Sequence, residues 1–115
     1  MNALKIRAGT IEEVRTARAL LVALSPRDGR PRQAIVVLDD EGVPRAYLNE
    51  CRHIPVPLDG GSGYVLDHTK RFLMCGTHGA LYQRRDGHCV TGPCRGERLL
   101  PLGIEREEDV LFVID

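Results

Sequence analysis

Two short segments of the 115-residue chain each place a cysteine close to a histidine. The first reads Cys51-Arg-His53 and the second Cys75-Gly-Thr-His78, and 21 residues separate His53 from Cys75. Thiolate sulfur and imidazole nitrogen are both ligands of transition metals in proteins. The two segments therefore predict one metal site with four ligands, two of each kind.

Two kinds of metal site fit this set of ligands. A 2Fe-2S cluster can have one iron bound by two cysteines and the other by two histidines, so that two facing loops each give one ligand to each iron. A structural zinc site also takes two cysteines and two histidines, but zinc fingers usually pair like with like. We favour the cluster, with a zinc-binding interaction module as the alternative.

The residues around these segments predict an all-β fold. Apolar or alternating runs predict antiparallel strands over residues 19–24, 34–38, 45–48, 71–74, 80–83 and 110–114. Turn residues at 25–29, 40–42 and 85–87 predict hairpins. The segments 50–63 and 75–79, rich in glycine or proline, are expected to be loops.

One short N-terminal helix is expected, from about Thr10 to Thr16, because Thr10 and Glu13 match a capping box. The expected architecture is an antiparallel β-sandwich or small barrel with two loops that bind the metal. Its length is that of a single domain, residues 1–115.

Composition excludes several classes of function. Sixteen basic residues balance sixteen acidic ones, so the overall charge favours neither nucleic acid nor an anionic membrane as a partner. The N-terminus lacks the apolar segment of a secretory signal, and no run approaches the ~18 apolar residues of a membrane span. We therefore expect a cytoplasmic protein, in which reduced cysteines bind metal or remain thiols.

The two segments and the residues after them resemble the Rieske ferredoxin family, whose pattern is C-x-H, a variable gap, and C-x-x-H. Gly79, Tyr82 and the turn at residues 86–87 have counterparts there, and residues 92–96 resemble the family's third, proline-containing loop. The resemblance covers residues 36–114 and implies one 2Fe-2S cluster bound by Cys51, His53, Cys75 and His78.

Departures from the membrane-complex members of the family indicate a soluble type. In those members a disulfide joins the positions of Val56 and Thr77, and a serine occupies the position of Ala80. Tyr82 matches the family's tyrosine that can hydrogen-bond a ligand thiolate. Fewer hydrogen-bond donors imply a lower reduction potential.

The resemblance implies a protein that passes single electrons between a reductase and an oxygenase or other oxidoreductase partner. Because the sequence ends at Asp115 directly after a predicted strand, we expect no attached catalytic iron domain and hence a carrier or small subunit rather than a catalyst.

The remaining cysteines and histidines have simpler interpretations. Cys89 and Cys94 could form a third ligand pair or a disulfide, but packing thiols are preferred. His68 and His88 are expected to be exposed. Arg52 lies within the first ligand segment and is expected near the tip of the cluster.

Overall fold

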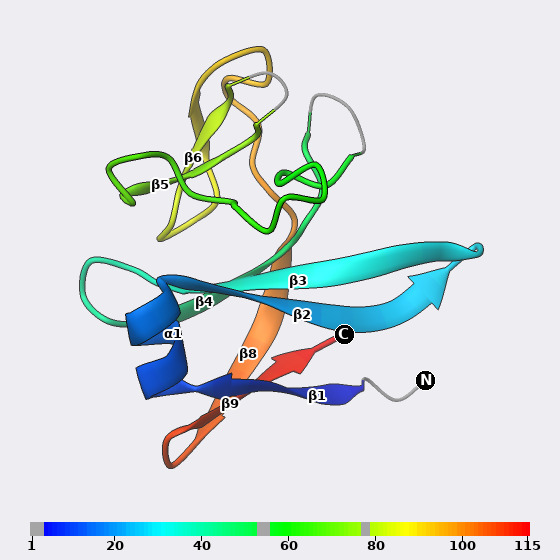
Figure 1. The fold of residues 1–115 in the computed structure, drawn as a ribbon, viewed down its shortest axis with the longest axis vertical. Helices are drawn as coiled ribbons and strands as arrows, with labels where there is room; N and C mark the ends of the chain where they lie inside the picture. Colours follow the sequence, from blue (N-terminus) through cyan, green and yellow to red (C-terminus); the bar gives the residue numbers. More distant parts are fainter. Residues whose placement is uncertain (1–3, 53–55, 77–78) are drawn as a thin grey trace.

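The computed structural model describes residues 4–52, 56–76 and 79–115 (Figure 1). Within these ranges, six strands form one antiparallel sheet in the order β1-β9-β8-β4-β3-β2. Their bounds are β1 Lys5–Thr10, β2 Ala19–Arg27, β3 Arg30–Leu38, β4 Pro44–Leu48, β8 Pro101–Glu107 and β9 Val110–Ile114. The second sheet has the order β5-β6-β7, with β5 Phe72–Met74, β6 Leu81–Gln83 and β7 Cys89–Thr91.

The large sheet curves until its two edge strands, β1 and β2, contact each other and nearly close a barrel. The helix α1 (Ile11–Ala17) joins these edges. It begins with the expected capping box: Thr10 Oγ1 accepts from the Glu13 N–H at 3.1 Å, and Glu13 Oε1 accepts from the Thr10 N–H at 3.0 Å. Ile11 and Val14 are buried against the sheet.

Strand β3 lies between two hydrophobic cores. Successive side chains of a strand point to opposite faces, and all four residues from Ala34 to Val37 are fully buried. Ala34 and Val36 pack inside the large sheet with α1 and β9. Ile35 and Val37 pack on the other face, against the small sheet and its loops. The large sheet therefore supports the small sheet through a continuous apolar contact.

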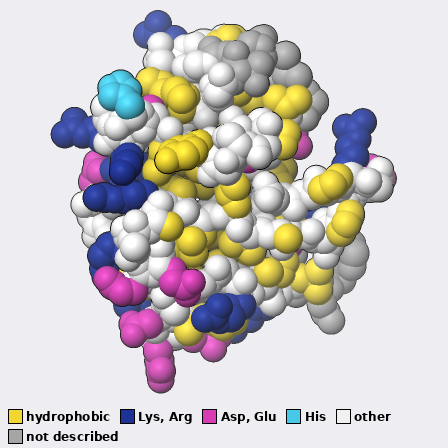
Figure 2. Space-filling view, viewed as in Figure 1, with side chains coloured by type: hydrophobic (Ala, Val, Ile, Leu, Met, Phe, Trp, Pro, Cys, Tyr) yellow, Lys and Arg dark blue, Asp and Glu magenta, His cyan; other side chains and the backbone are white. Residues whose placement is uncertain are grey.

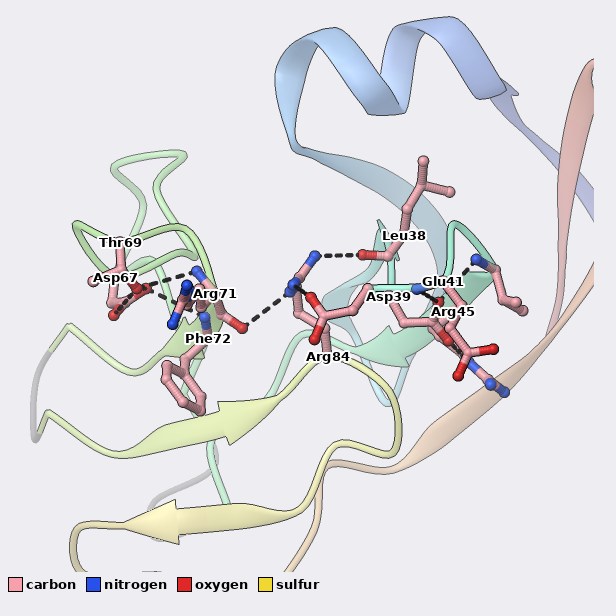
Figure 3. Close-up of polar contacts among 11 residues, drawn as sticks. Leu38, Asp39, Glu41, Arg45, Asp67, Thr69, Arg71, Phe72 and Arg84 are labelled. Atoms are coloured by element: carbon pink, nitrogen blue, oxygen red, sulfur yellow. Dashed lines mark hydrogen bonds and ion pairs between the residues drawn. The ribbon is translucent and has the colours of Figure 1, made fainter.

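Arg84, which follows β6, links the two sheets at their edge (Figure 3). Its guanidinium donates to the carbonyl of Arg71, before β5, at 3.0 Å and to the carbonyl of Leu38, at the end of β3, at 2.7 Å. It also forms an ion pair with Asp40. One side chain thus fixes the orientation of the small sheet on the large one.

The all-β prediction with one short helix is confirmed, but one turn is shorter than predicted and some strands were missed. Ser25 to Arg27 belong to β2, so the turn is only Asp28-Gly29. Glu105 to Glu107 are exposed and belong to β8, which lies outside the predicted strand ranges. Strands β1 and β7 were not predicted, because Lys5–Thr10 has little apolar character and Cys89–Thr91 is very short.

Candidate functional site

Cys51 and Cys75 come from different sheets and are buried in the same core. Cys51 follows β4 of the large sheet, and Cys75 follows β5 of the small sheet. Their exposed fractions are 2% and 0%. Both thiols belong to the core cluster that lies between the two sheets. The folded chain therefore brings the two cysteines of its predicted metal-binding loops into one region.

Backbone hydrogen bonds close each loop around its cysteine. The N–H of Cys51 donates to the carbonyl of Val56 at 2.8 Å. The N–H of Cys75 donates to the carbonyl of Ala80 at 2.9 Å, and the N–H of Gly79 donates to the carbonyl of Cys75 at 2.8 Å. Gly79 has a positive φ of 70°, a conformation that a residue with a side chain rarely adopts. These turns hold each cysteine at a defined position.

The two loops are also tied to each other. The N–H of Gly76, in the second loop, donates to the carbonyl of Leu58, in the first, at 2.9 Å. Asn49 holds the base of the first loop: its Oδ1 accepts from the Leu58 N–H at 2.8 Å, and its Nδ2 donates to Asp59 at 3.1 Å. The Gly76–Leu58 hydrogen bond thus joins the two loops through their backbones.

The two predicted histidine ligands, His53 and His78, lie outside the described residues. Within residues 4–52, 56–76 and 79–115, there is no group of three or more His, Cys, Asp or Glu side chains that could hold a metal ion. The other two histidines, His68 and His88, lie within the described residues. His68 is exposed as predicted, whereas His88 is half-buried, which corrects the expectation for that residue.

The hydroxyl of Tyr82 reaches one of the predicted ligands. The side chain is fully buried, and its Oη lies 3.5 Å from Cys51 Sγ. The same oxygen accepts a hydrogen bond from the backbone N–H of Arg52 at 3.2 Å. Burial, together with the contacts to Cys94 and Cys51, raises the pKa of Tyr82 above its usual value. The phenol therefore keeps its proton and can act as a hydrogen-bond donor.

Cys94 contacts the Tyr82 hydroxyl, and Cys89 contacts Cys94; neither cysteine forms a disulfide. They are buried, as expected for packing thiols, with their Sγ atoms 3.2 Å apart. Burial and the contact with Cys94 raise the pKa of Cys89 to about 12. Cys94 Sγ also lies 2.8 Å from Tyr82 Oη, a contact that the sequence analysis did not predict. The only sequence signal for it was the position of Cys94 in the third loop.

The third loop packs directly on the residue that follows the second cysteine loop. Gly92 has φ 105°, and a Cβ built on it would lie 2.7 Å from the Cα of Ala80. Only glycine allows this approach. Arg52 reaches toward the same loop, where its Nε lies 3.8 Å from a carboxylate oxygen of Glu97. The third loop thus covers the side of the site formed by Ala80, Tyr82 and Arg52.

The face in Figure 2 carries charges of both signs together with apolar side chains. Acidic and basic groups are intermixed toward the left and lower edges, and apolar groups gather across the middle of the view. This mixture agrees with the equal numbers of acidic and basic residues in the chain. No helix among the described residues is long and apolar enough to cross a membrane.

Comparison with known families matches residues 8–105 to the Rieske [2Fe-2S] domain. The chain belongs to this family, and its cofactor is a 2Fe-2S cluster. Such a cluster takes up and releases one electron at a time. No curated protein matches the sequence.

The fold is similar to domains of larger solved proteins. The terminal oxygenases of carbazole 1,9a-dioxygenase from Novosphingobium sp. KA1 and from Nocardioides aromaticivorans IC177 give TM-scores of 0.72 and 0.70, at 22% and 21% identity. Each alignment covers 95% of this chain and 29% of the other. The reduced complex between oxygenase and ferredoxin of carbazole 1,9a-dioxygenase gives a TM-score of 0.67 at 21% identity. That alignment covers 95% of this chain and 27% of the other. This chain spans less than a third of these neighbours.

The described residues fit the cluster of the family. Thiolate sulfur is the usual ligand of iron in such clusters, and the two buried cysteines, on two loops of one core, could supply it. Tyr82 adds a protonated hydroxyl near one of these sulfurs. Hydrogen bonds to ligand sulfur are among the features by which a protein tunes the potential of an iron–sulfur centre.

Proposed function

We propose that Cys51, His53, Cys75 and His78 bind the cluster, the two cysteines on one iron and the two histidines on the other. The observation that carries this proposal is the convergence of Cys51 and Cys75, buried in one core from two loops that a Gly76–Leu58 hydrogen bond joins. His53 and His78 follow these cysteines by two and three residues. The assignment of the histidines rests on that spacing.

In this proposal, the protein carries single electrons. The bound cluster supplies the redox chemistry, changing its charge by one electron between its two states. The chain's own residues exclude water from the thiolates, since Cys51 and Cys75 are buried, and place the Tyr82 hydroxyl toward Cys51. They hold the two loops in one arrangement, so that little has to move when the charge changes.

We further propose that the partner is a redox protein, namely a reductase, an oxygenase or a comparable oxidoreductase. The similarity in fold to oxygenase and ferredoxin components supports an exchange of electrons between proteins. We place the chain, as a single domain of residues 1–115, in the cytoplasm. The contact between the two cores across β3 supports the single domain, and the Cys89 and Cys94 thiols suit a reducing compartment.

The ligand set is tested on protein purified without oxygen. The purified chain should be red-brown and contain two irons and two sulfides, and its reduced form should give a rhombic EPR signal with a low average g value. A colourless protein with one zinc would support the alternative zinc-binding module and contradict this proposal.

Single substitutions then test each ligand. Replacing Cys51, His53, Cys75 or His78 by Ala should each abolish the bound iron and sulfide. The matched controls are Cys89→Ser, a buried cysteine outside the ligand set, and His68→Ala, an exposed histidine. Both should retain the cluster. Full iron content in His78→Ala would show that this histidine is not a ligand.

A further inference from the structure

A continuous line of polar contacts runs from β7, through Cys94 of the third loop, to Cys51. The thiol of Cys89 donates to the carbonyl of Thr91 at 3.2 Å. Cys94 Sγ lies 3.2 Å from Cys89 Sγ and 2.8 Å from Tyr82 Oη, which in turn lies 3.5 Å from Cys51 Sγ. Every sulfur in this line is buried. Which atom donates and which accepts in each of these contacts depends on where each proton points.

The proton of Tyr82 has two possible acceptors. A phenol has one proton to donate and two lone pairs to accept with, and one lone pair already receives the N–H of Arg52. The proton can point to Cys51 or to Cys94. If the Tyr82 proton points to Cys51, the second lone pair of Tyr82 Oη is free to accept a hydrogen bond from Cys94.

Charge decides between the two acceptors. In the proposed ligand set Cys51 is a thiolate bound to iron, whereas Cys94 lies outside that set and forms no disulfide. Hydrogen bonds to an ionised acceptor are roughly twice as strong as bonds between neutral groups, and a thiol sulfur is a weak acceptor. The Tyr82 proton therefore points to Cys51.

The proton of Cys94 also has two possible acceptors: Cys89 Sγ, to which the thiol donates at 3.2 Å in the metal-free chain, and Tyr82 Oη. The oxygen is nearer, at 2.8 Å against 3.2 Å, and it is the better acceptor. The proton of Cys89 is already directed to the Thr91 carbonyl. The Cys94 thiol thus donates to Tyr82, and a donor on the phenol oxygen strengthens the bond that the phenol itself donates.

We propose that Cys94 is a positioning residue for the Tyr82 hydroxyl: its thiol donates to Tyr82 Oη and holds the phenol proton on Cys51, which raises the reduction potential of the protein. This inference rests on the proposed assignment of Cys51 as a ligand. Its physical basis is that reduction adds negative charge to the ligand sulfurs, so a hydrogen bond to Cys51 stabilises the reduced form more than the oxidised one.

The test is a double-mutant cycle measured by protein-film voltammetry on protein with equal iron and sulfide content. Tyr82→Phe should lower the midpoint potential, and Cys94→Ala should lower it by a smaller amount. In the double variant, Cys94→Ala should add nothing to the shift caused by Tyr82→Phe, because Cys94 acts through that hydroxyl. Cys94→Ser, whose hydroxyl can still donate, should restore a potential close to that of the wild type.

Cys89→Ala is the matched control, since it removes another buried thiol from the same line without touching Tyr82. It should shift the potential less than Cys94→Ala. Three results would overturn the proposal: a Cys94→Ala potential that is unchanged or higher than wild type, a Cys94→Ala shift that persists without the Tyr82 hydroxyl, or an equal shift from Cys89→Ala.

Failure of the ligand assignment has a different signature. If Cys51→Ala kept its iron and sulfide, Cys51 would not be a ligand, and the role of Cys94 would fall with that assignment. If Cys51→Ala lost the cluster while Cys94→Ala left the potential unchanged, the ligand set would stand and only the role of Cys94 would be wrong.

Discussion

The residues around Cys51 and Cys75 differ in whether their side chains can donate a hydrogen bond to sulfur. Tyr82 brings a protonated hydroxyl within 3.5 Å of Cys51 Sγ. Ala80, which is fully buried and whose carbonyl accepts from the Cys75 N–H at 2.9 Å, offers only a methyl group. The described site therefore has a side-chain donor on the Cys51 side, and position 80 can be used to add one on the Cys75 side.

We expect Ala80→Ser to raise the midpoint potential. The new hydroxyl would donate to cluster sulfur and favour the more negative, reduced state, by roughly 40 mV for each kcal/mol of difference between the two states. Voltammetry on protein with full iron content measures the shift. Ala80→Gly, which removes the methyl group without adding a donor, is the control. A serine variant no higher in potential than the wild type would show that position 80 does not face the cluster sulfur.

At the scale of elements, the loops and turns carry the most demanding backbone geometry. The third loop approaches Ala80 so closely at Gly92 that a Cβ would contact backbone at 2.7 Å. The turn between β3 and β4 depends on Asp39, whose Oδ1 accepts from the N–H groups of Glu41 and Val43, both at 2.9 Å. At each of these two positions we expect a substitution to lower the stability of the fold by a measurable amount.

Gly92→Ala should lower the free energy of unfolding by about 3 kcal/mol, because it adds both backbone strain and a clash with Ala80. Gly96→Ala is a suitable comparison: Gly96 also has a positive φ, of 95°, but a Cβ there meets nothing within 4 Å. Gly96→Ala should lower the free energy of unfolding by about 1 kcal/mol, from backbone strain alone. Equal costs in urea denaturation would mean that the contact with Ala80 is not tight.

Asp39 should make stability depend on acid pH. Burial alone would raise the pKa of Asp39, but the N–H groups of Val43 and Glu41 and the nearby Arg45 outweigh it and lower the pKa. A carboxylate with a lowered pKa in the folded state stabilises the fold above its unfolded-state pKa, about 3.9, and this contribution disappears as the pH falls through the folded-state pKa.

The measurement is the thermal unfolding midpoint of the wild type and of Asp39→Asn from pH 7 to pH 3. The variant should be less stable than the wild type at neutral pH, and the difference should shrink below about pH 4. Comparison at each pH removes any acid effect that the two proteins share. A constant difference across the range would show that Asp39 makes no pH-dependent contribution.

For the whole molecule, the orientation of the small sheet determines where Cys75 lies relative to Cys51. The core around Ile35 and Val37 provides most of the contact between the sheets, but apolar contact has little directional preference. Arg84 supplies the direction through its bonds to the carbonyls of Arg71 and Leu38 (Figure 3). Its side chain is only 18% exposed.

Arg84→Ala should lower the free energy of unfolding by about 2 kcal/mol, since it leaves two carbonyls without this donor. Arg84→Lys should recover little of this, because one ammonium group lacks the planar fork that bonds both carbonyls. Arg85→Ala is the control, with a side chain 71% exposed. Hydrogen exchange should show faster opening of β5 and β6 in Arg84→Ala; protection equal to the wild type would argue against the link.

Local sequence by itself determined the turns, the short helix and the two cysteine loops. The turns predicted at residues 25–29 and 40–42 and the Thr10–Glu13 capping box depend on residues close together in the chain, so the sequence located them, although the first turn is only Asp28-Gly29. The same is true of the two Cys-His segments, whose spacing indicated an iron–sulfur protein and whose family the comparison confirmed.

Only the tertiary structure decided which distant groups meet. Strand β1 pairs with β9, and the thiol of Cys94, in the third loop, meets the hydroxyl of Tyr82 in β6. Arg84 bonds a carbonyl 46 positions away in the chain. These contacts depend on packing across the two cores, which no local pattern encodes. For that reason the sequence indicated Cys51, Cys75 and Tyr82, while the contact of Cys94 with Tyr82 and the link made by Arg84 became visible only in the folded chain.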